Sequence, residues 1–295
     1  MGRRTTLEIA ETKIVEYFTK IPKGVLTPDQ IEEILEEHRG VWGLANSVTV
    51  SKFLTFLVER TKLRVIEIKF PSTLIRNFYR YSWGETSPLA IAASLKPEYY
   101  FSHYTAMSFH QMTEQMPKII YLTWQQPEKT RIIRPLEQKK IDWAFDQPPR
   151  ISENTASCND HQICILYGMH TGSLGIIESE GPEGEKLRVT NVERTLIDIT
   201  VRPFYAGGVF EVLKAFKFAK NRVSINKLAV MLKKIGYVYP YHQAIGFYLE
   251  KSGVYKESAI KIFRKMDMNY DFYLTYQMRD KAYSKDWRLF YPKGL

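Results

Sequence analysis

The chain has 295 residues, of which 44% are hydrophobic and 14% aromatic, a composition that excludes a disordered protein and is typical of a globular one. No stretch reaches the roughly 18 uncharged apolar residues that a membrane helix needs, so we expect no membrane partner. The first residues lead into a charged amphipathic segment rather than a secretory signal, and two cysteines make no disulfide framework, so we expect a cytoplasmic protein. The net charge of +10 favours a polyanionic partner.

A length near 300 residues is large for one hydrophobic core and predicts two domains. We expect an α+β protein: a winged helix-turn-helix with a hinge at residues 1–83, and a larger mixed domain at 84–295 that is mainly helical after about residue 210. Residues 211–295 hold 17 Lys and Arg against 7 Asp and Glu, whereas residues 84–210 hold 12 against 15. The positive excess therefore belongs to the C-terminal third.

Three helices and a strand are predicted in the first domain. Apolar periodicity places the first helix at residues 7–18, and the capping signal of Thr27, Pro28 and Gln30 begins a second that ends near Gly40. A third helix is predicted at residues 48–60 and a strand at 63–70. The side chains expected to face inward from these two elements are Val50, Phe53, Leu54, Leu57, Val58, Leu63, Val65 and Ile66.

This element order is typical of a winged helix, whose third helix enters the major groove of DNA. Between residues 44 and 83, seven basic residues stand against two acidic ones, so the third helix and the strand share a positive field. The residues predicted to contact double-stranded operator DNA are Ser47, Thr49, Ser51, Lys52, Thr55, Arg60, Lys62, Arg64 and Lys69. A solvated lysine-bearing face, or a winged helix that contacts proteins, would explain the same pattern.

Residues 75–84 alternate arginines with aromatic side chains. Such a segment could stack on single-stranded nucleic acid, but we interpret it as the hinge between the domains.

The second domain is predicted to mix helices and strands. We expect a helix at residues 89–95, strands at 118–124, 131–134, 163–169, 175–178 and 187–189, and mostly helices from residue 192 onward. That order indicates an α+β domain.

Two blocks of this domain form recognisable motifs. The first covers residues 102–123, and the second reads Val-Glu-Arg-Thr-Leu-Ile-Asp at 192–198, then Arg-Pro at 202–203 and Tyr-Ala-Gly-Gly at 205–208. Together with residues 244–253 and 287–292, they resemble the AbiEi-family antitoxins of type IV toxin–antitoxin systems over nearly the whole chain. The resemblance implies a winged helix that represses its own operon, and a C-terminal domain that neutralises a cognate nucleotidyltransferase toxin of an abortive-infection system without requiring a stable complex.

The second motif also has a physical interpretation of its own. Asn191 or Thr190 would cap a helix on whose polar face Arg194 and Asp198 form an i,i+4 pair, and the two glycines would allow a tight turn before the next helix. The motif either fixes a junction between helices or makes the pair part of a pocket or partner surface. The candidate residues are Glu193, Arg194, Thr195, Asp198, Gly207 and Gly208.

A basic cluster follows between residues 214 and 235, which contain no acidic residue. It could contact phosphates or an acidic or RNA-bound toxin, or be a solvated face. Its members are Lys214, Lys217, Lys220, Arg222, Lys227, Lys233 and Lys234.

Catalytic motifs are not found: the sequence has no phosphate-binding loop, nucleophile elbow or zinc-protease motif, so we expect neither an enzyme nor a cofactor. Cys158, His161 and Cys164 have a spacing that could bind zinc, but Cys164 lies in an apolar run that predicts a buried strand, so we expect no metal. The carboxylates at 178–185 beside Lys186 could serve a nuclease, although the glycines and proline among them favour a hairpin loop.

The sequence therefore predicts an antitoxin and transcriptional autorepressor. The alternative is a stand-alone winged-helix transcription factor whose C-terminal domain senses a ligand or oligomerises.

Overall fold

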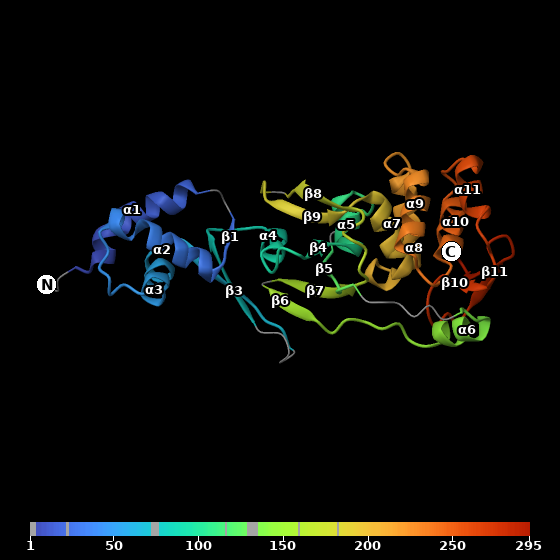
Figure 1. Ribbon diagram of the computed structural model, residues 1–295, viewed down its shortest axis with the longest axis horizontal. Coiled ribbons are helices and arrows are strands. Elements are labelled where there is room, and N and C mark those ends of the chain that lie inside the picture. Colours follow the sequence, from blue (N-terminus) through green and yellow to red (C-terminus); the bar gives the residue numbers. More distant parts are fainter. Residues whose placement is uncertain are drawn as a thin grey trace. The chain divides into compact units, whose positions relative to one another are not determined.

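The computed structural model describes residues 4–21, 24–71, 77–115, 117–128, 135–158, 160–181 and 183–295. The chain is an α+β protein, as expected, and divides into two compact units (Figure 1). Unit 1 comprises Met1–Glu98, Asn154–Ile163 and Ser179–Leu187, and unit 2 comprises Tyr99–Glu153, Cys164–Glu178 and Arg188–Leu295. Among the described residues, no helix is both long and apolar enough to cross a membrane.

Unit 1 begins with three helices, each capped by a threonine: α1 (Thr6–Lys20), α2 (Pro28–Trp42) and α3 (Val50–Arg60). The side chains of Thr5, Thr27 and Thr49 accept hydrogen bonds from backbone amides of the first turn, and Glu8 and Gln30 complete reciprocal capping boxes at α1 and α2. The three predicted helices are confirmed, with α3 beginning at Val50 rather than at residue 48.

A three-stranded sheet completes this part of unit 1. Its strands β1 (Val25–Leu26), β2 (Leu63–Ile68) and β3 (Phe78–Trp83) have the order β1-β3-β2 and are antiparallel. The helices and sheet share a core in which Ile14, Phe18, Ile31, Leu35 and Phe53 are among the fully buried side chains.

The inward face of α3 and β2 differs in part from the prediction. Phe56 is buried whereas Val58 is 38% exposed, and Ile66 is buried whereas Val65 is 46% exposed. In β2 the neighbouring residues Arg64 and Val65 are both exposed. Strict alternation, which would place Leu63 and Val65 on the same inward face, therefore does not hold.

The predicted hinge is instead the central strand of this sheet. Phe78–Trp83 forms β3, which pairs with both β1 and β2, while residues 75 and 76 lie outside the described residues. Arg80, one of the basic residues expected to contribute to the positive field, is only 6% exposed, and its guanidinium donates to the carbonyls of Ser94 and Leu95. These bonds join β3 to the end of α4 (Pro88–Ala93), so unit 1 continues to Glu98, past the boundary drawn at residue 83.

A six-stranded sheet has the order β6-β7-β5-β4-β9-β8. Its strands are β4 (Tyr100–Phe101), β5 (Ile119–Gln125), β6 (Thr155–Cys158), β7 (His161–Gly168), β8 (Ile176–Glu180) and β9 (Lys186–Thr190). β4 is antiparallel to β5 and parallel to β9. Four predicted strands are confirmed within a few residues, and the strand predicted at 131–134 lies outside the described residues.

The helices of unit 2 pack around a central helix, α7 (Val192–Val201). They are α5 (His103–Phe109), α6 (Gln138–Asp146), α7 (Val192–Val201), a short 3-10 helix (Pro203–Tyr205), α8 (Val209–Ala219), α9 (Ile225–Ile235), α10 (Tyr241–Lys251) and α11 (Glu257–Arg264). α7 packs against α5, α8, α9 and α10 (Figure 1), and every residue from 193 to 200 is buried. The motif identified in the sequence therefore lies at the centre of unit 2.

The C-terminal part is mainly helical, as expected, but it also contains a small sheet that the sequence did not indicate. β10 (Phe272–Tyr273), β11 (Lys281–Ser284) and β12 (Leu289–Pro292) form a small sheet in the order β10-β12-β11. Its strands are too short to show a clear period of two in the sequence.

Candidate functional site

The first candidate site is the exposed face of α3 in unit 1. The turn that precedes α3 is fixed by Arg39, whose guanidinium donates to the carbonyls of Ala45 (3.1 Å) and Val48 (3.0 Å) and pairs with Glu36. Gly43, at a φ of 66°, ends α2 in the left-handed conformation that reverses the chain. These contacts determine which side chains of α3 face solvent.

All nine predicted DNA-contacting residues are at least partly exposed: Ser47, Thr49, Ser51, Lys52, Thr55, Arg60, Lys62, Arg64 and Lys69. Ser47 and Thr49 precede the helix rather than lie on it. Thr49 accepts a hydrogen bond from the Lys52 backbone amide, and Lys52 Nζ donates to the Ser47 carbonyl at 3.3 Å. Hydroxyls and a cation thus gather at the N-terminal end of α3.

Three of the other predicted cations form exposed ion pairs. Arg60 lies 3.3 Å from Glu11, Arg64 lies 3.3 Å from Glu85, and Lys69 lies 2.9 Å from Glu67. Such pairs stabilise a protein by at most about 1 kcal/mol, so a phosphate can replace the carboxylate at little cost. Lys52 and Lys62 form no ion pair with any described carboxylate.

The second candidate site is the Arg194–Asp198 pair of α7 in unit 2. The expected pair is confirmed, with Arg194 Nε donating to Asp198 Oδ1 at 2.8 Å. Its expected place on a polar face is wrong, because the two side chains are only 3% and 8% exposed. Asn191 caps the helix, as one of the two residues proposed for that role, by accepting from the Arg194 amide.

Arg194 also connects α7 to the turn before β8. Its Nη1 donates to the Leu174 carbonyl at 2.8 Å and to the Thr171 hydroxyl at 3.1 Å. Gly175 allows this approach, because a Cβ there would lie 2.7 Å from the Arg194 Cβ and its φ is 75°.

The charge state of the pair follows from burial and proximity. Burial, the largest single effect, acts to lower the pKa of Arg194, but the Asp198 carboxylate, with smaller contributions from Tyr100 and Tyr237, outweighs it and holds that pKa above its ordinary range. Burial raises the pKa of Asp198, and the guanidinium opposes that rise. We conclude that the pair is ionised at neutral pH, because neutralising either group would remove the charge that strengthens the hydrogen bond between them.

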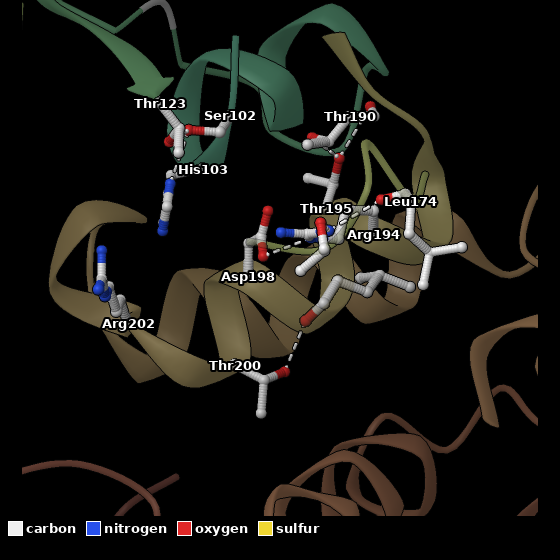
Figure 2. A network of polar contacts seen from close by, with 12 residues as sticks. Ser102, His103, Thr123, Leu174, Thr190, Arg194, Thr195, Asp198, Thr200 and Arg202 are labelled. Atoms are coloured by element: carbon white, nitrogen blue, oxygen red, sulfur yellow. Dashed lines mark hydrogen bonds and ion pairs between the residues drawn. The ribbon is translucent and has the colours of Figure 1, made fainter. Parts of the chain in front are cut away.

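His103 approaches this pair from α5. Its Nδ1 lies 2.8 Å from the Ser102 hydroxyl, which lies 2.7 Å from the Thr123 hydroxyl. Figure 2 shows the far end of the ring pointing into the space between Arg202 and Asp198. Burial, together with the charges of Arg202 and Arg194, lowers the pKa of His103 well below its usual range, so the ring is neutral. Ser102 is fully buried between two partners and therefore positions His103 rather than acting as a nucleophile.

A small cavity of about 60 Å³ separates these groups, enough for a few water molecules or a small polar group. His103, Arg194, Asp198 and Arg202 line it together with Tyr100 and Tyr237. Tyr100 is 1% exposed, and its hydroxyl has no hydrogen-bond partner among the described residues. Burial, with the nearby Asp198 charge, raises the pKa of Tyr100 to about 12 against the opposing effects of Arg194 and of the Gln125 amide. The hydroxyl is therefore neutral, and its proton has no acceptor among the described residues.

The other motif residues hold neighbouring elements in place. Glu193 accepts a hydrogen bond from the Ser224 amide at 2.8 Å, ahead of α9, and Thr195 bonds to the Thr190 hydroxyl at 2.8 Å. Gly207 and Gly208 have φ values of 77° and 92° and form the tight turn expected before α8. The motif thus fixes a junction between helices, and two of its residues, Arg194 and Asp198, also line the cavity.

The basic cluster is exposed to solvent, but two of its members also make contacts within the chain. All seven residues, Lys214, Lys217, Lys220, Arg222, Lys227, Lys233 and Lys234, are exposed on or beside α8 and α9. Lys214 pairs with Glu211 at 2.6 Å, and Arg222 donates to the carbonyls of His110, Gln111 and Phe218. Arg222 therefore holds the α8–α9 connection, whereas the six lysines remain exposed to solvent.

The described part of the chain contains no group of three or more His, Cys, Asp or Glu residues that could hold a metal ion. Cys158 and Cys164 are buried free thiols. Of the acidic residues between 178 and 185, Glu178 and Glu180 lie in β8, and Glu183 and Glu185 accept hydrogen bonds from Thr86 and Ser87 ahead of β9.

Sequence reasoning did not single out the five other polar or aromatic residues of the cavity: Tyr100, His103, Thr123, Arg202 and Tyr237. His103 and Arg202 stand in the two motif blocks, but they are far apart in the sequence, and only the packing of α5 against α7 brings them together. Tyr100 and Tyr237 carry no local signal that separates them from the many other tyrosines of the chain.

No protein-family model matches the chain, and no curated protein is significantly similar to it. Among solved structures, the fold is similar to that of the Rv2827c protein from Mycobacterium tuberculosis, with a TM-score of 0.63 and 11% sequence identity. The superposition covers 98% of this chain and 92% of that protein. At this identity the likeness concerns the fold alone, and it extends over both units of the α+β chain.

Proposed function

We propose that the chain is a DNA-binding autorepressor and antitoxin, in which unit 1 binds operator DNA as a winged helix and unit 2 counteracts a nucleotidyltransferase toxin. The DNA-binding half is supported by the element order of unit 1 and by the sheet order β1-β3-β2. The antitoxin half is supported by the resemblance of the motifs at 102–123 and 192–208 to AbiEi-family antitoxins.

The observation that carries the DNA-binding half is the exposed group at the N-terminal end of α3. Ser47, Thr49 and Ser51 are short enough to let the backbone come close to a phosphate, and Lys52 supplies a cation beside them. Thr55 lies one turn further along α3 and Lys62 just beyond its end, both accessible to solvent. A helix presented in this way can enter a major groove with its hydroxyls toward base edges.

The test is a fluorescence-anisotropy titration of the full chain against its own promoter at about 50 and 200 mM salt. We expect the wild-type chain to bind more weakly as the salt concentration rises. In a Lys52→Ala/Lys62→Ala variant, the slope of log K against log salt concentration should become shallower by about 0.9 for each phosphate that is no longer neutralised. Lys13→Ala/Lys20→Ala is the matched control, because it removes the same charge from exposed positions of α1. Equal weakening in both variants, or no binding at all, contradicts the assignment to α3.

The antitoxin half needs a separate experiment. Co-expression with a cognate nucleotidyltransferase toxin should restore growth of a host that the toxin alone arrests. The Lys52→Ala/Lys62→Ala variant should still protect when expressed from a heterologous promoter, since the proposal assigns protection to unit 2. Failure to protect, with the protein folded, overturns this half and leaves the DNA-binding half intact.

A second candidate function is a transcription regulator that responds to a small ligand. One observation favours it: the unpartnered Tyr100 hydroxyl in the cavity of unit 2. Buried polar groups in folded proteins normally have partners, so an unsatisfied donor beside charged groups marks a place where a ligand atom can bind.

A further inference from the structure

A groove of about 700 Å³ lies beside the small cavity of unit 2. The two share Val201, Arg202 and Tyr237 in their walls, so Arg202 stands where they meet. A volume of this size is within the range of small-molecule sites, roughly 300–1,000 Å³. The groove belongs to unit 2 alone.

Aromatic side chains dominate the walls of the groove. They are Trp143, Phe204, Tyr237, Tyr239, Tyr241 and Tyr276. The hydroxyls of the four tyrosines form no hydrogen bond with another described residue. Burial, the main cause, raises the pKa of Tyr237, Tyr241 and Tyr276, so these hydroxyls are neutral and free to donate.

Two arginines give the groove a positive charge. Arg150 and Arg202 line it, and neither forms an ion pair with a carboxylate among the described residues. Among the described residues, Arg202 Nη1 and Nη2 donate hydrogen bonds only to the Tyr167 carbonyl, at 3.4 and 3.3 Å. The Asp198 carboxylate interacts with Arg202 electrostatically, but it is already paired with Arg194. Two guanidinium groups that form no ion pair of their own favour an anionic group, above all a phosphate, which arginine can bind through two parallel hydrogen bonds.

We propose that this groove and the adjoining cavity bind a nucleotide. Its base stacks on the tyrosines, its phosphate neutralises Arg202 and Arg150, and a polar atom of the ligand or a bridging water accepts the hydrogen bond of Tyr100. Base stacking on aromatic side chains and phosphate binding by arginine together match both the walls and the charge of the groove. An aromatic acid lacking a sugar would fill only a fraction of the volume.

The experiment is isothermal titration calorimetry of the full chain with the four ribonucleoside 5′-monophosphates and the corresponding triphosphates. We expect 1:1 binding of at least one of them with a Kd below about 1 mM. Inorganic phosphate and the matching nucleoside, each lacking half of the ligand, should bind at least tenfold more weakly. A short single-stranded RNA serves as a further probe.

Variants separate this site from others on the same unit. Arg202→Ala should weaken binding at least tenfold, whereas Lys227→Ala, which removes one cation of the basic cluster, should leave it unchanged. Tyr100→Phe should raise the melting temperature of the free protein, because it removes an unsatisfied buried hydroxyl, and should reduce the further rise that the nucleotide produces.

Three results would overturn the proposal. The first is no binding of any nucleotide at concentrations up to about 1 mM. The second is binding that Arg202→Ala leaves intact or that Lys227→Ala abolishes. The third is RNA binding tenfold tighter than that of the mononucleotide, which would make the groove part of an RNA-binding surface. Each result is independent of whether unit 1 binds DNA.

Discussion

Gly246 of α10 lies directly against the indole ring of Trp287, so closely that a Cβ at position 246 would overlap the ring. Trp287 is completely buried, and its Nε1 donates to Glu250, one turn further along the same helix. Gln243, one turn earlier, donates to the Trp287 carbonyl at 2.7 Å. One face of α10 therefore holds the segment between β11 and β12, and the absence of a side chain at 246 makes room for it.

Gly246→Ala should consequently destabilise the protein although alanine favours helices. Overpacking of a filled core costs about 1–3 kcal/mol, more than the helix-propensity gain of about 1 kcal/mol. Gly40→Ala is the matched control, since Gly40 also lies in a helix but a Cβ there would meet nothing within 4 Å. Urea unfolding should show a lower midpoint for the first variant and a slightly higher one for the second. An unchanged midpoint for Gly246→Ala would mean that Trp287 can move away.

The buried ion pair leads to a second prediction. Asp198→Asn leaves the Arg194 guanidinium without a counter-charge at 3% exposure, which should cost about 3–5 kcal/mol. Replacing both residues, as Arg194→Met with Asp198→Leu, should cost much less than the sum of the two single changes, because no charge is then left buried. Urea unfolding of the single and double variants measures the coupling. Additive effects would show that the two side chains act independently.

Much of unit 1 could be predicted because its signals are local. Each helix begins at a threonine that caps it, and two of these caps carry the reciprocal Glu or Gln three residues later. The role of residues 78–83 was not predictable in the same way. An alternation of aromatic residues and arginines fits a strand or an exposed linker equally well, and Arg80 is buried only because the carbonyls of Ser94 and Leu95 accept its hydrogen bonds.

The site in unit 2 could be predicted only in part. The pairing of Arg194 with Asp198 follows from helical spacing, but their burial does not, because four helices cover α7 from parts of the chain up to about a hundred residues away. His103, Tyr100 and the groove tyrosines are assembled by tertiary packing alone. Burial of a polar pair in the middle of a helix breaks the usual amphipathic pattern, and such a departure is expected where function, not stability, selects the residue.

The neutral state of His103 predicts a dependence of stability on pH. Burial, the main cause, lowers the pKa of His103, so the unfolded chain, with a pKa near 6.5, binds a proton more readily than the folded one. The contribution of neutral His103 to the free energy of unfolding is therefore fully present above about pH 6.5. It is lost as the pH falls below that value, by up to about 1.4 kcal/mol per pH unit. His103→Asn, which suits the φ of 51°, should flatten this fall between about pH 6.5 and 5.5. The exposed His170→Asn should not; an equal effect of both variants would assign the titration elsewhere.

The ion pair between Glu11 and Arg60 gives a prediction specific to DNA binding. Glu11 on α1 lies 3.3 Å from the Arg60 guanidinium at the end of α3, where it competes with any phosphate for the same donors. Glu11→Gln should therefore strengthen promoter binding by about 1.4- to fivefold, in line with the roughly 0.2–1 kcal/mol of an exposed pair. Glu33→Gln removes the same charge from an exposed position of α2 that forms no ion pair with a described residue, and should change the affinity less. Anisotropy titrations at one salt concentration compare the two. If both variants strengthen binding equally, the gain is a general effect of net charge and Arg60 lies outside the interface.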